Sequence, residues 1–121
     1  GSNYDGIHGA GAAKFARAWG AKMGQASGRM GQTYAIVTKD LKTGEFVGWE
    51  KVKEQFDVFI EHVKTNRSNQ FLLTPIGTGL AGAKIEDLNE FLNNQTYENT
   101  DNSIIENTNY KLIFNNNIIS K

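Results

Sequence analysis

The stretch Tyr34-Ala-Ile-Val-Thr38, followed by the periodic stretch at residues 52–63, decides the class of fold that this chain can adopt. The first stretch is an apolar run bounded by polar residues, which predicts a buried strand ending at Lys39-Asp40. The second places its apolar side chains on one stripe of a helix, and charged side chains cover the opposite face. That stripe consists of Val52, Phe56, Phe59, Ile60 and Val63. A buried strand followed by an amphipathic helix predicts an α/β domain.

The flanking segments extend this alternation in both directions. An alanine-rich helix is expected before Gly20, which ends it, and residues 21–32 are expected to form a loop or a short strand. Residues 41–48 predict a connection or small hairpin. The remaining expected elements are a buried strand at Phe71–Thr74, a helix from about Lys84 with Ile85, Leu88, Phe91 and Leu92 inward, an Asn-rich loop at 93–109, and a last strand at Tyr110–Phe114 before an Asn-rich tail. The order predicts βαβ units and a partly parallel sheet covered by helices.

Length and composition exclude several classes of protein. The chain has 121 residues and a mass of 13.4 kDa, so residues 1–121 are expected to form a single domain. Its formal net charge of zero argues against a general nucleic-acid binder. With no cysteine and two histidines, no disulfide and no metal site is expected. No apolar run approaches a membrane span and no signal peptide opens the chain, which predicts a cytoplasmic protein that does not bind a membrane.

Two glycine clusters are the features most suggestive of function. They are Gly9-Ala-Gly11 and Gly77-Thr-Gly-Leu-Ala-Gly82, and each precedes an expected helix. Exposed backbone amides at such a position can bind an anion, and small residues let a phosphate approach closely. Residues 1–32 also carry four basic side chains against one acidic one. The alternative is that these glycines serve only as tight turns.

The second cluster also fits the G-x-G-x-x-G dinucleotide pattern at Gly77, Gly79 and Gly82. That pattern requires an acidic residue at the end of the next strand, where this chain has Asn115-Asn-Asn117. The Walker pattern of nucleoside triphosphatases is absent from the sequence. Neither common nucleotide fingerprint therefore accounts for the glycines.

Three motifs in order resemble those of the macrodomain family. Gly9-Ala-Gly-Ala-Ala-Lys-Phe15 with Trp19-Gly20 resembles the Gly-Ala-Gly-Ile-Ala loop of that family and the Phe-Gly that follows it. Tyr34-Ala-Ile-Val-Thr-Lys39 is similar to its Tyr-Leu-Ile-Thr-Lys strand, and Pro75-Ile-Gly-Thr-Gly-Leu80 to its Pro-Arg-Ile-Gly-Cys-Gly-Leu loop. The nearest branch is the terminal ADP-ribose glycohydrolase type, shared with DNA-ADP-ribose-removing antitoxins. Short bacterial or phage proteins have a similar opening.

The resemblance implies a three-layer α/β/α sandwich with a mixed, partly parallel sheet, shortened at its N-terminus. It implies binding of ADP-ribose or a related NAD-derived nucleotide, with no cofactor, and an ADP-ribosylated protein or nucleic acid as a further partner. The first loop would hold one side of the diphosphate and the distal ribose, the second loop the other side, and Asn3 would contact a ribose. The ligand-binding residues implied are Asn3, Gly9, Ala10, Gly11, Ala12, Gly77, Thr78, Gly79, Leu80, Ala81 and Gly82.

The resemblance also implies a catalytic role for Lys39, since that branch uses the strand-end lysine to attack the anomeric carbon of the distal ribose. An amine whose pKa is lowered by burial can form a Schiff base with the ring-opened sugar. The branch resolves this intermediate with an aspartate where this chain has Ala81. Asp40 should point to the opposite face of the strand, whereas His8 is a candidate proton shuttle or else a turn-stabilising or solvent-facing residue. Removal of ADP-ribose by hydrolysis therefore stays open beside its alternative, a non-catalytic reader or sponge of such nucleotides.

The opening of the chain departs from the family, because macrodomains have one or two strands before the first glycine loop. The acidic residue that recognises adenine in the family lies in that part. No residue here is thus assigned to adenine, and Tyr110, Phe114 or Trp49 are candidates for stacking on it. Core packing is the stronger expectation for Phe114.

Overall fold

The computed structural model describes residues 1–66, 69, 71 and 73–94. Within that part the chain is a mixed α/β structure with one three-stranded sheet, one two-stranded sheet and three α-helices. Of the expected loop at 93–109, Asn93 instead belongs to the last helix, Ile85–Asn93, and residues 95–109 lie outside the described residues. The strand at Tyr110–Phe114 and the Asn-rich tail also lie outside them.

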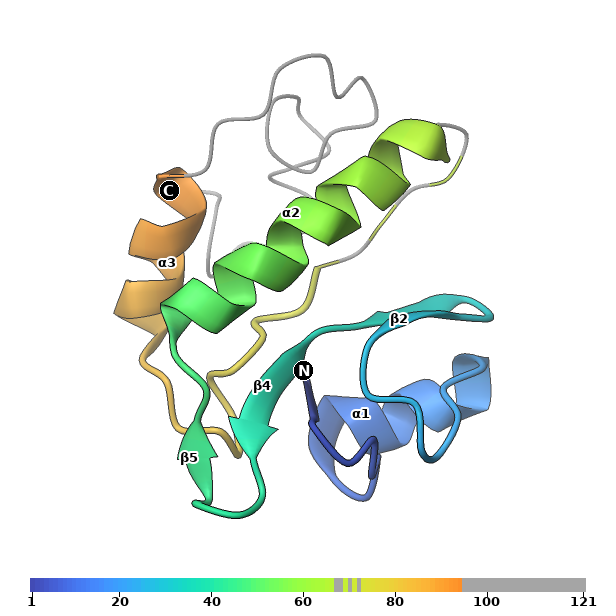
Figure 1. The fold of residues 1–121 in the computed structure, drawn as a ribbon, viewed down its shortest axis with the longest axis horizontal. Helices are drawn as coiled ribbons and strands as arrows, with labels where there is room; N and C mark the ends of the chain where they lie inside the picture. Colours follow the sequence, from blue (N-terminus) through green and yellow to red (C-terminus); the bar gives the residue numbers. More distant parts are fainter. Residues whose placement is uncertain (67–68, 70, 72, 95–121) are drawn as a thin grey trace.

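The three-stranded sheet contains a βαβ unit, although its first strand, at Ser2–Asn3, is one that the sequence did not predict. Strand β1 (Ser2–Asn3) runs parallel to β4 (Val37–Asp40), and β4 pairs antiparallel with β5 (Glu45–Phe46). The connection from β1 to β4 includes α1 (Gly11–Ala16), which lies on the opposite side of β4 from the long helix α2 (Figure 1). A partly parallel sheet and a hairpin within residues 41–48 are therefore both confirmed.

The expected strand at 34–38 is two strands. Strand β3 (Thr33–Ala35) pairs antiparallel with β2 (Gly28–Met30), whereas β4 begins at Val37 and pairs with β1. The backbone changes partner at Ile36, whose carbonyl accepts a hydrogen bond of 2.8 Å from the Ser2 amide. An apolar run predicts burial but does not reveal such a switch, because both halves pack against the same core.

Helix α1 is short and continues as a 3-10 turn, η1 (Arg17–Trp19). Gly20 ends it in the left-handed region with φ of 118°, as the sequence predicts. A β-carbon on Gly20 would lie 2.8 Å from the Met30 carbonyl oxygen and 2.9 Å from Gly31 Cα, so the helix end touches the β2–β3 hairpin. The Gln32 amide donates to the Trp19 carbonyl at 2.9 Å and secures this crossing.

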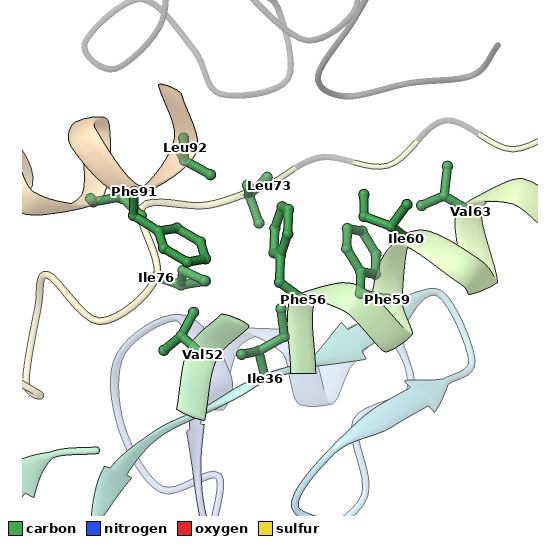
Figure 2. Packing of buried hydrophobic residues seen from close by; sticks show 11 residues of the cluster. Ile36, Val52, Phe56, Phe59, Ile60, Val63, Leu73, Ile76, Phe91 and Leu92 are labelled. Carbon is green, nitrogen blue, oxygen red and sulfur yellow. The ribbon is translucent and has the colours of Figure 1, made fainter. Parts of the chain in front are cut away.

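Helices α2 (Trp49–Thr65) and α3 (Ile85–Asn93) form the core together with Ile36, Leu73 and Ile76. Phe56 is fully buried and lies between Ile36 and Leu73 in Figure 2. The predicted stripe of α2 is buried throughout, and in α3 the inward positions are correct except Ile85, which is 36% exposed. Burial of side chains of this size stabilises a fold by about 1.5–3 kcal/mol each.

The expectation of a strand at Phe71–Thr74 is wrong for the residues described there. Phe71, Leu73 and Thr74 belong to no strand, although Leu73 is buried and Phe71 packs against the core. The apolar pattern correctly predicts burial here, while the backbone pairing that makes a strand is not formed by these three residues.

Candidate functional site

A cavity of about 580 Å³ lies where the two glycine loops meet, and we call it the loop cavity. Its volume is within the range of small-molecule sites. Both clusters contribute to its wall, together with the ends of β1 and β4. Its lining consists of Gly1, Ser2, Asn3, Ile7, Gly9, Ala10, Gly11, Ala12, Ala13, Thr38, Lys39, Leu41, Thr74, Pro75, Ile76, Gly77, Thr78, Gly79, Leu80 and Ala81. Two segments far apart in the sequence therefore form one site.

Two glycines of the loop cavity are not explained by backbone conformation. Ten of the 13 glycines have positive φ, which side chains rarely adopt, but Gly9 and Gly79 do not. A β-carbon would meet only an Ile7 carbon at 3.7 Å when placed on Gly9, and nothing within 4 Å when placed on Gly79. Neither glycine is required by the folded chain itself, so the open space beside each is available to a ligand.

Both loops present backbone amides to which no acceptor is assigned. Among the residues that the structure describes, the amides of Gly9, Ala10, Gly11 and Ala12 donate no hydrogen bond, and neither do those of Gly79, Leu80 and Ala81. The loop at 77–83 is held by other bonds, since the Ala83 amide donates to the Gly77 carbonyl at 2.8 Å and the Gly82 amide to the Gly79 carbonyl at 3.0 Å. Successive free amides in a turn form an anion-binding concavity.

Helix dipoles contribute less to this site than the sequence suggests. Helix α1 has only six residues, and α3 begins at Ile85, three residues after Gly82. Each cluster does stand just before a helix, as expected, although Ala83 and Lys84 separate the second cluster from α3. The free amides themselves, rather than helix termini, are the anion-binding feature.

Lys39 is the only charged side chain among the described residues that line the loop cavity, and no carboxylate lies among them. It is partly buried and pairs with Asn3 in the register of β1 and β4. No ion pair to Lys39 is formed within the described chain, where the salt bridges lie on α2. Asp40 lies outside the lining, and its Oδ1 accepts the Lys42 amide at 2.9 Å in the hairpin turn. The cavity is thus suited to an anion.

The side chain of Asn3 is engaged with the backbone of the first loop. Its Nδ2 donates to the Ile7 carbonyl at 2.8 Å, and its Oδ1 accepts the Ile7 amide at 3.0 Å. This pair of bonds fixes the turn that leads into Gly9. An amide side chain retains one further donor and acceptor when two of its sites are used. Asn3 can therefore shape the loop and still contact a ligand.

Two predicted site residues, His8 and Gly82, do not line the loop cavity. His8 is 1% exposed, and its Nε2 lies 3.0 Å from the Gln25 carbonyl oxygen. The interpretation as a solvent-facing histidine is wrong, while the interpretation as a turn-stabilising one agrees with this bond. No hydrogen-bond partner is present for its Nδ1 among the described residues. Because His8 does not line the loop cavity, it cannot transfer a proton directly to a group bound beside Lys39.

A second cavity, of about 680 Å³, lies beside the first, and we call it the aromatic cavity. Its wall includes His8 and the rings of Phe15, Trp19, Tyr34, Phe59 and Phe71. Sequence reasoning missed this site, because Phe15 and Trp19 follow a helical spacing that is typical of core residues. Both are exposed, at 71% and 51%.

Trp49, one of the three candidates for stacking on a base, instead packs against the core. Its ring stacks on Phe91 with centroids 5.1 Å apart and contacts Phe46 at 4.8 Å. Tyr110 and Phe114 lie outside the described residues.

Within the described ranges, no group of three or more histidine, aspartate or glutamate side chains could hold a metal ion. None of the helices described is long and apolar enough to cross a bilayer. Comparison of the chain with family models, curated proteins and solved structures finds no match.

Proposed function

We propose that this chain is a macrodomain-like module that binds ADP-ribose or a related NAD-derived nucleotide in the loop cavity. The free amides of both loops would receive the diphosphate, and Lys39 would lie beside the distal ribose. The observation that carries the proposal is the convergence of Gly9–Ala13 and Gly77–Ala81 on one cavity whose lining has a lysine and no carboxylate. A three-layer sandwich around the observed βαβ unit belongs to the same proposal.

The proposed site has a catalytic and a non-catalytic version. In the first, the Lys39 amine attacks the anomeric carbon of the distal ribose, the bond to the modified target breaks, and water releases ADP-ribose from the lysyl intermediate. That release needs a proton donor and acceptor, and Ala81 supplies neither. The lining without a carboxylate favours the second version, a reader or sponge that binds the nucleotide without turnover.

Isothermal titration calorimetry with ADP-ribose, ADP and ribose 5-phosphate tests the binding proposal. We expect the wild type to bind ADP-ribose and ADP, and the Gly79→Val variant to lose at least tenfold in affinity, or about 1.4 kcal/mol. Because a β-carbon on Gly79 would meet nothing within 4 Å and Gly79 does not have a positive φ, the variant should keep its circular dichroism spectrum and urea midpoint. No heat from any of the three ligands with folded wild type would refute the proposal.

Borohydride trapping separates the two versions. The wild type is incubated with an ADP-ribosylated peptide or oligonucleotide, reduced, and digested for mass spectrometry. The catalytic version requires an adduct on Lys39 and loss of release in Lys39→Ala. Lys42→Ala is the matched control, because Lys42 is exposed on the same hairpin and does not line the cavity. Binding with no adduct and no release supports the reader instead.

A further inference from the structure

The aromatic cavity has one charged side chain in a wall that is mostly apolar. Arg29 is the only charged side chain among the described residues that line it, and no carboxylate lies among them. The volume of about 680 Å³ is within the range of small-molecule sites. An apolar cavity with one basic side chain is suited to an apolar ligand that carries one negative charge.

The guanidinium of Arg29 is held in place by the chain but not neutralised by it. Its Nε donates to the Gly31 carbonyl at 3.0 Å, and its Nη1 lies 3.4 Å from His62 Nε2. Within the described part of the chain Arg29 forms no ion pair, and both N–H groups of Nη2 lack an acceptor. A guanidinium presents its donors as a planar fork that matches the two oxygens of a carboxylate.

Most of the chain around this cavity is also free of acidic residues. From Gly6 to Lys39 the sequence has five basic side chains and no aspartate or glutamate. Helix α1, η1 and the β2–β3 hairpin all lie within that stretch. A local excess of positive charge beside an apolar cavity raises the local concentration of anions.

The balance of charge favours a carboxylate over a phosphate. A phosphate monoester carries a charge of about −1.5 to −2 near neutral pH, so one guanidinium would leave part of it unpaired against an apolar wall. A carboxylate carries a single charge, which Arg29 balances. The rings of Phe15 and Trp19, 71% and 51% exposed, offer apolar surface that the rest of such a ligand can cover.

We propose that the aromatic cavity binds a small apolar monocarboxylate, of which an arylalkanoic acid is the example. The carboxylate pairs with the Arg29 guanidinium, and the aryl group packs against the rings of Trp19 and Phe71. Neither glycine cluster contributes to the wall of this cavity, so the site does not depend on the nucleotide proposed for the loop cavity.

Three phenyl compounds that differ in charge test the proposal: 3-phenylpropionate, 3-phenylpropionamide and 3-phenylpropylamine. Heteronuclear NMR follows the indole N–H signal of Trp19, which the Trp49→Phe variant assigns because the chain has only two tryptophans. We expect 3-phenylpropionate to shift this signal saturably with a Kd of about 0.1–1 mM. The amide should bind at least about tenfold more weakly, because it lacks the charge-assisted hydrogen bonds, and the amine should not bind.

Arg29→Gln should reduce the affinity for 3-phenylpropionate to that of the amide and leave the affinity for the amide unchanged. Arg17→Gln is the matched control, because Arg17 is exposed on η1 and lines neither cavity. Saturation with 3-phenylpropionate should also raise the pKa of His62, which burial and the Arg29 charge lower, since the bound carboxylate offsets that charge.

This proposal and the nucleotide proposal fail separately. Gly79→Val should leave the titration with 3-phenylpropionate unchanged while it weakens ADP-ribose binding. Equal affinities for the carboxylate and the amide, or an unchanged affinity in Arg29→Gln, would overturn the carboxylate site. No shift with 3-phenylpropionate in the folded wild type would overturn it as well. Much tighter binding of an acetylated tripeptide that ends in phenylalanine would overturn the small ligand in favour of the chain end of a protein.

Discussion

Leu80 lies against Gly11: its Cδ1 is 3.8 Å from the position that a β-carbon would take on Gly11. This proximity brings the two glycine loops together at the loop cavity, which both residues line. Leu80 is nevertheless 67% exposed, so most of its side chain faces solvent beside the proposed diphosphate position. A change at Leu80 should therefore affect an anionic ligand much more than it affects folding.

The Leu80→Glu variant tests the sign of charge that the loop cavity accepts. A carboxylate placed there should weaken ADP-ribose binding by about three- to tenfold at low salt, and by less at high salt. Val58→Glu is the matched control, because Val58 is 63% exposed on α2 and does not line either cavity. Calorimetry at two ionic strengths measures both variants. Equal affinities for the two would argue against an anion beside Leu80.

Alanine at Gly77 and at Gly79 should have opposite effects on stability. Gly77 has φ of 77°, and a β-carbon would lie 3.0 Å from Phe46 Cε1, so Gly77→Ala should lower the free energy of unfolding by about 1–2 kcal/mol. Gly79→Ala meets neither obstacle and should be neutral or slightly stabilising, because alanine restricts the unfolded chain. Urea denaturation of both variants measures the difference, and similar midpoints would contradict the distinction.

The side chain of Gln55, on α2, forms hydrogen bonds with the backbone of Val37 at the start of β4. The Val37 amide donates to Gln55 Oε1 at 2.6 Å, and Gln55 Nε2 donates back to the Val37 carbonyl at 2.9 Å. Gln55→Leu removes both partners from a buried backbone unit and should cost about 2–4 kcal/mol. Glu54→Leu, one position away on the exposed face, should change stability by less than about 0.5 kcal/mol. Equal urea midpoints for the two would show that the Gln55 bonds are dispensable.

Acid should destabilise the fold through His62. Burial lowers the pKa of His62, and the Arg29 guanidinium, 3.4 Å from its Nε2, lowers this pKa further. The unfolded chain therefore binds a proton more readily than the folded one, so stability falls as pH drops from about 6.5 through the lowered pKa. Stability measured between pH 7.5 and 5 should show this decline.

Two variants test whether His62 is the group that causes this loss of stability in acid. Arg29→Gln removes the repelling charge and should move the His62 pKa upward, which NMR of the imidazole protons measures. His62→Gln removes the titrating group and should flatten the decline over the same pH interval. A decline of unchanged slope in His62→Gln would assign the acid sensitivity to other groups.

Helix α2 could be predicted from the sequence because a single periodic stripe determines which face is buried. Val52, Phe56 and Val63 are fully buried as that stripe requires. The break between β3 and β4 could not be predicted, since Ile36, where it falls, is as apolar and as buried as the neighbouring Val37. The pairing of β4 depends on a partner distant in the chain, Ser2, and that of β3 on a hairpin partner, Arg29; local composition specifies neither.

The sequence indicates the residues that line the loop cavity better than those that line the aromatic cavity. Gly9 and Gly79 can be singled out from the sequence because they belong to dense glycine clusters, and in the folded chain both loops line one cavity. His8 could be noticed but not assigned, because its burial depends on Gln25 and the turn around it. The exposed rings of Phe15 and Trp19 could not be distinguished from core residues, since the same spacing fits both environments.

The close approach of Gly20 and Gly31 constrains which substitutions the protein can accept at these two positions. Each glycine occupies the space that a methyl group on the other segment would need, with Gly31 φ of 59° and Gly20 φ of 118°. Substituting either one displaces both segments, so a second substitution opposite adds the strain of its own positive φ but little further clash. Mutations at these two positions should thus be strongly epistatic, so natural selection is expected to retain or replace them jointly.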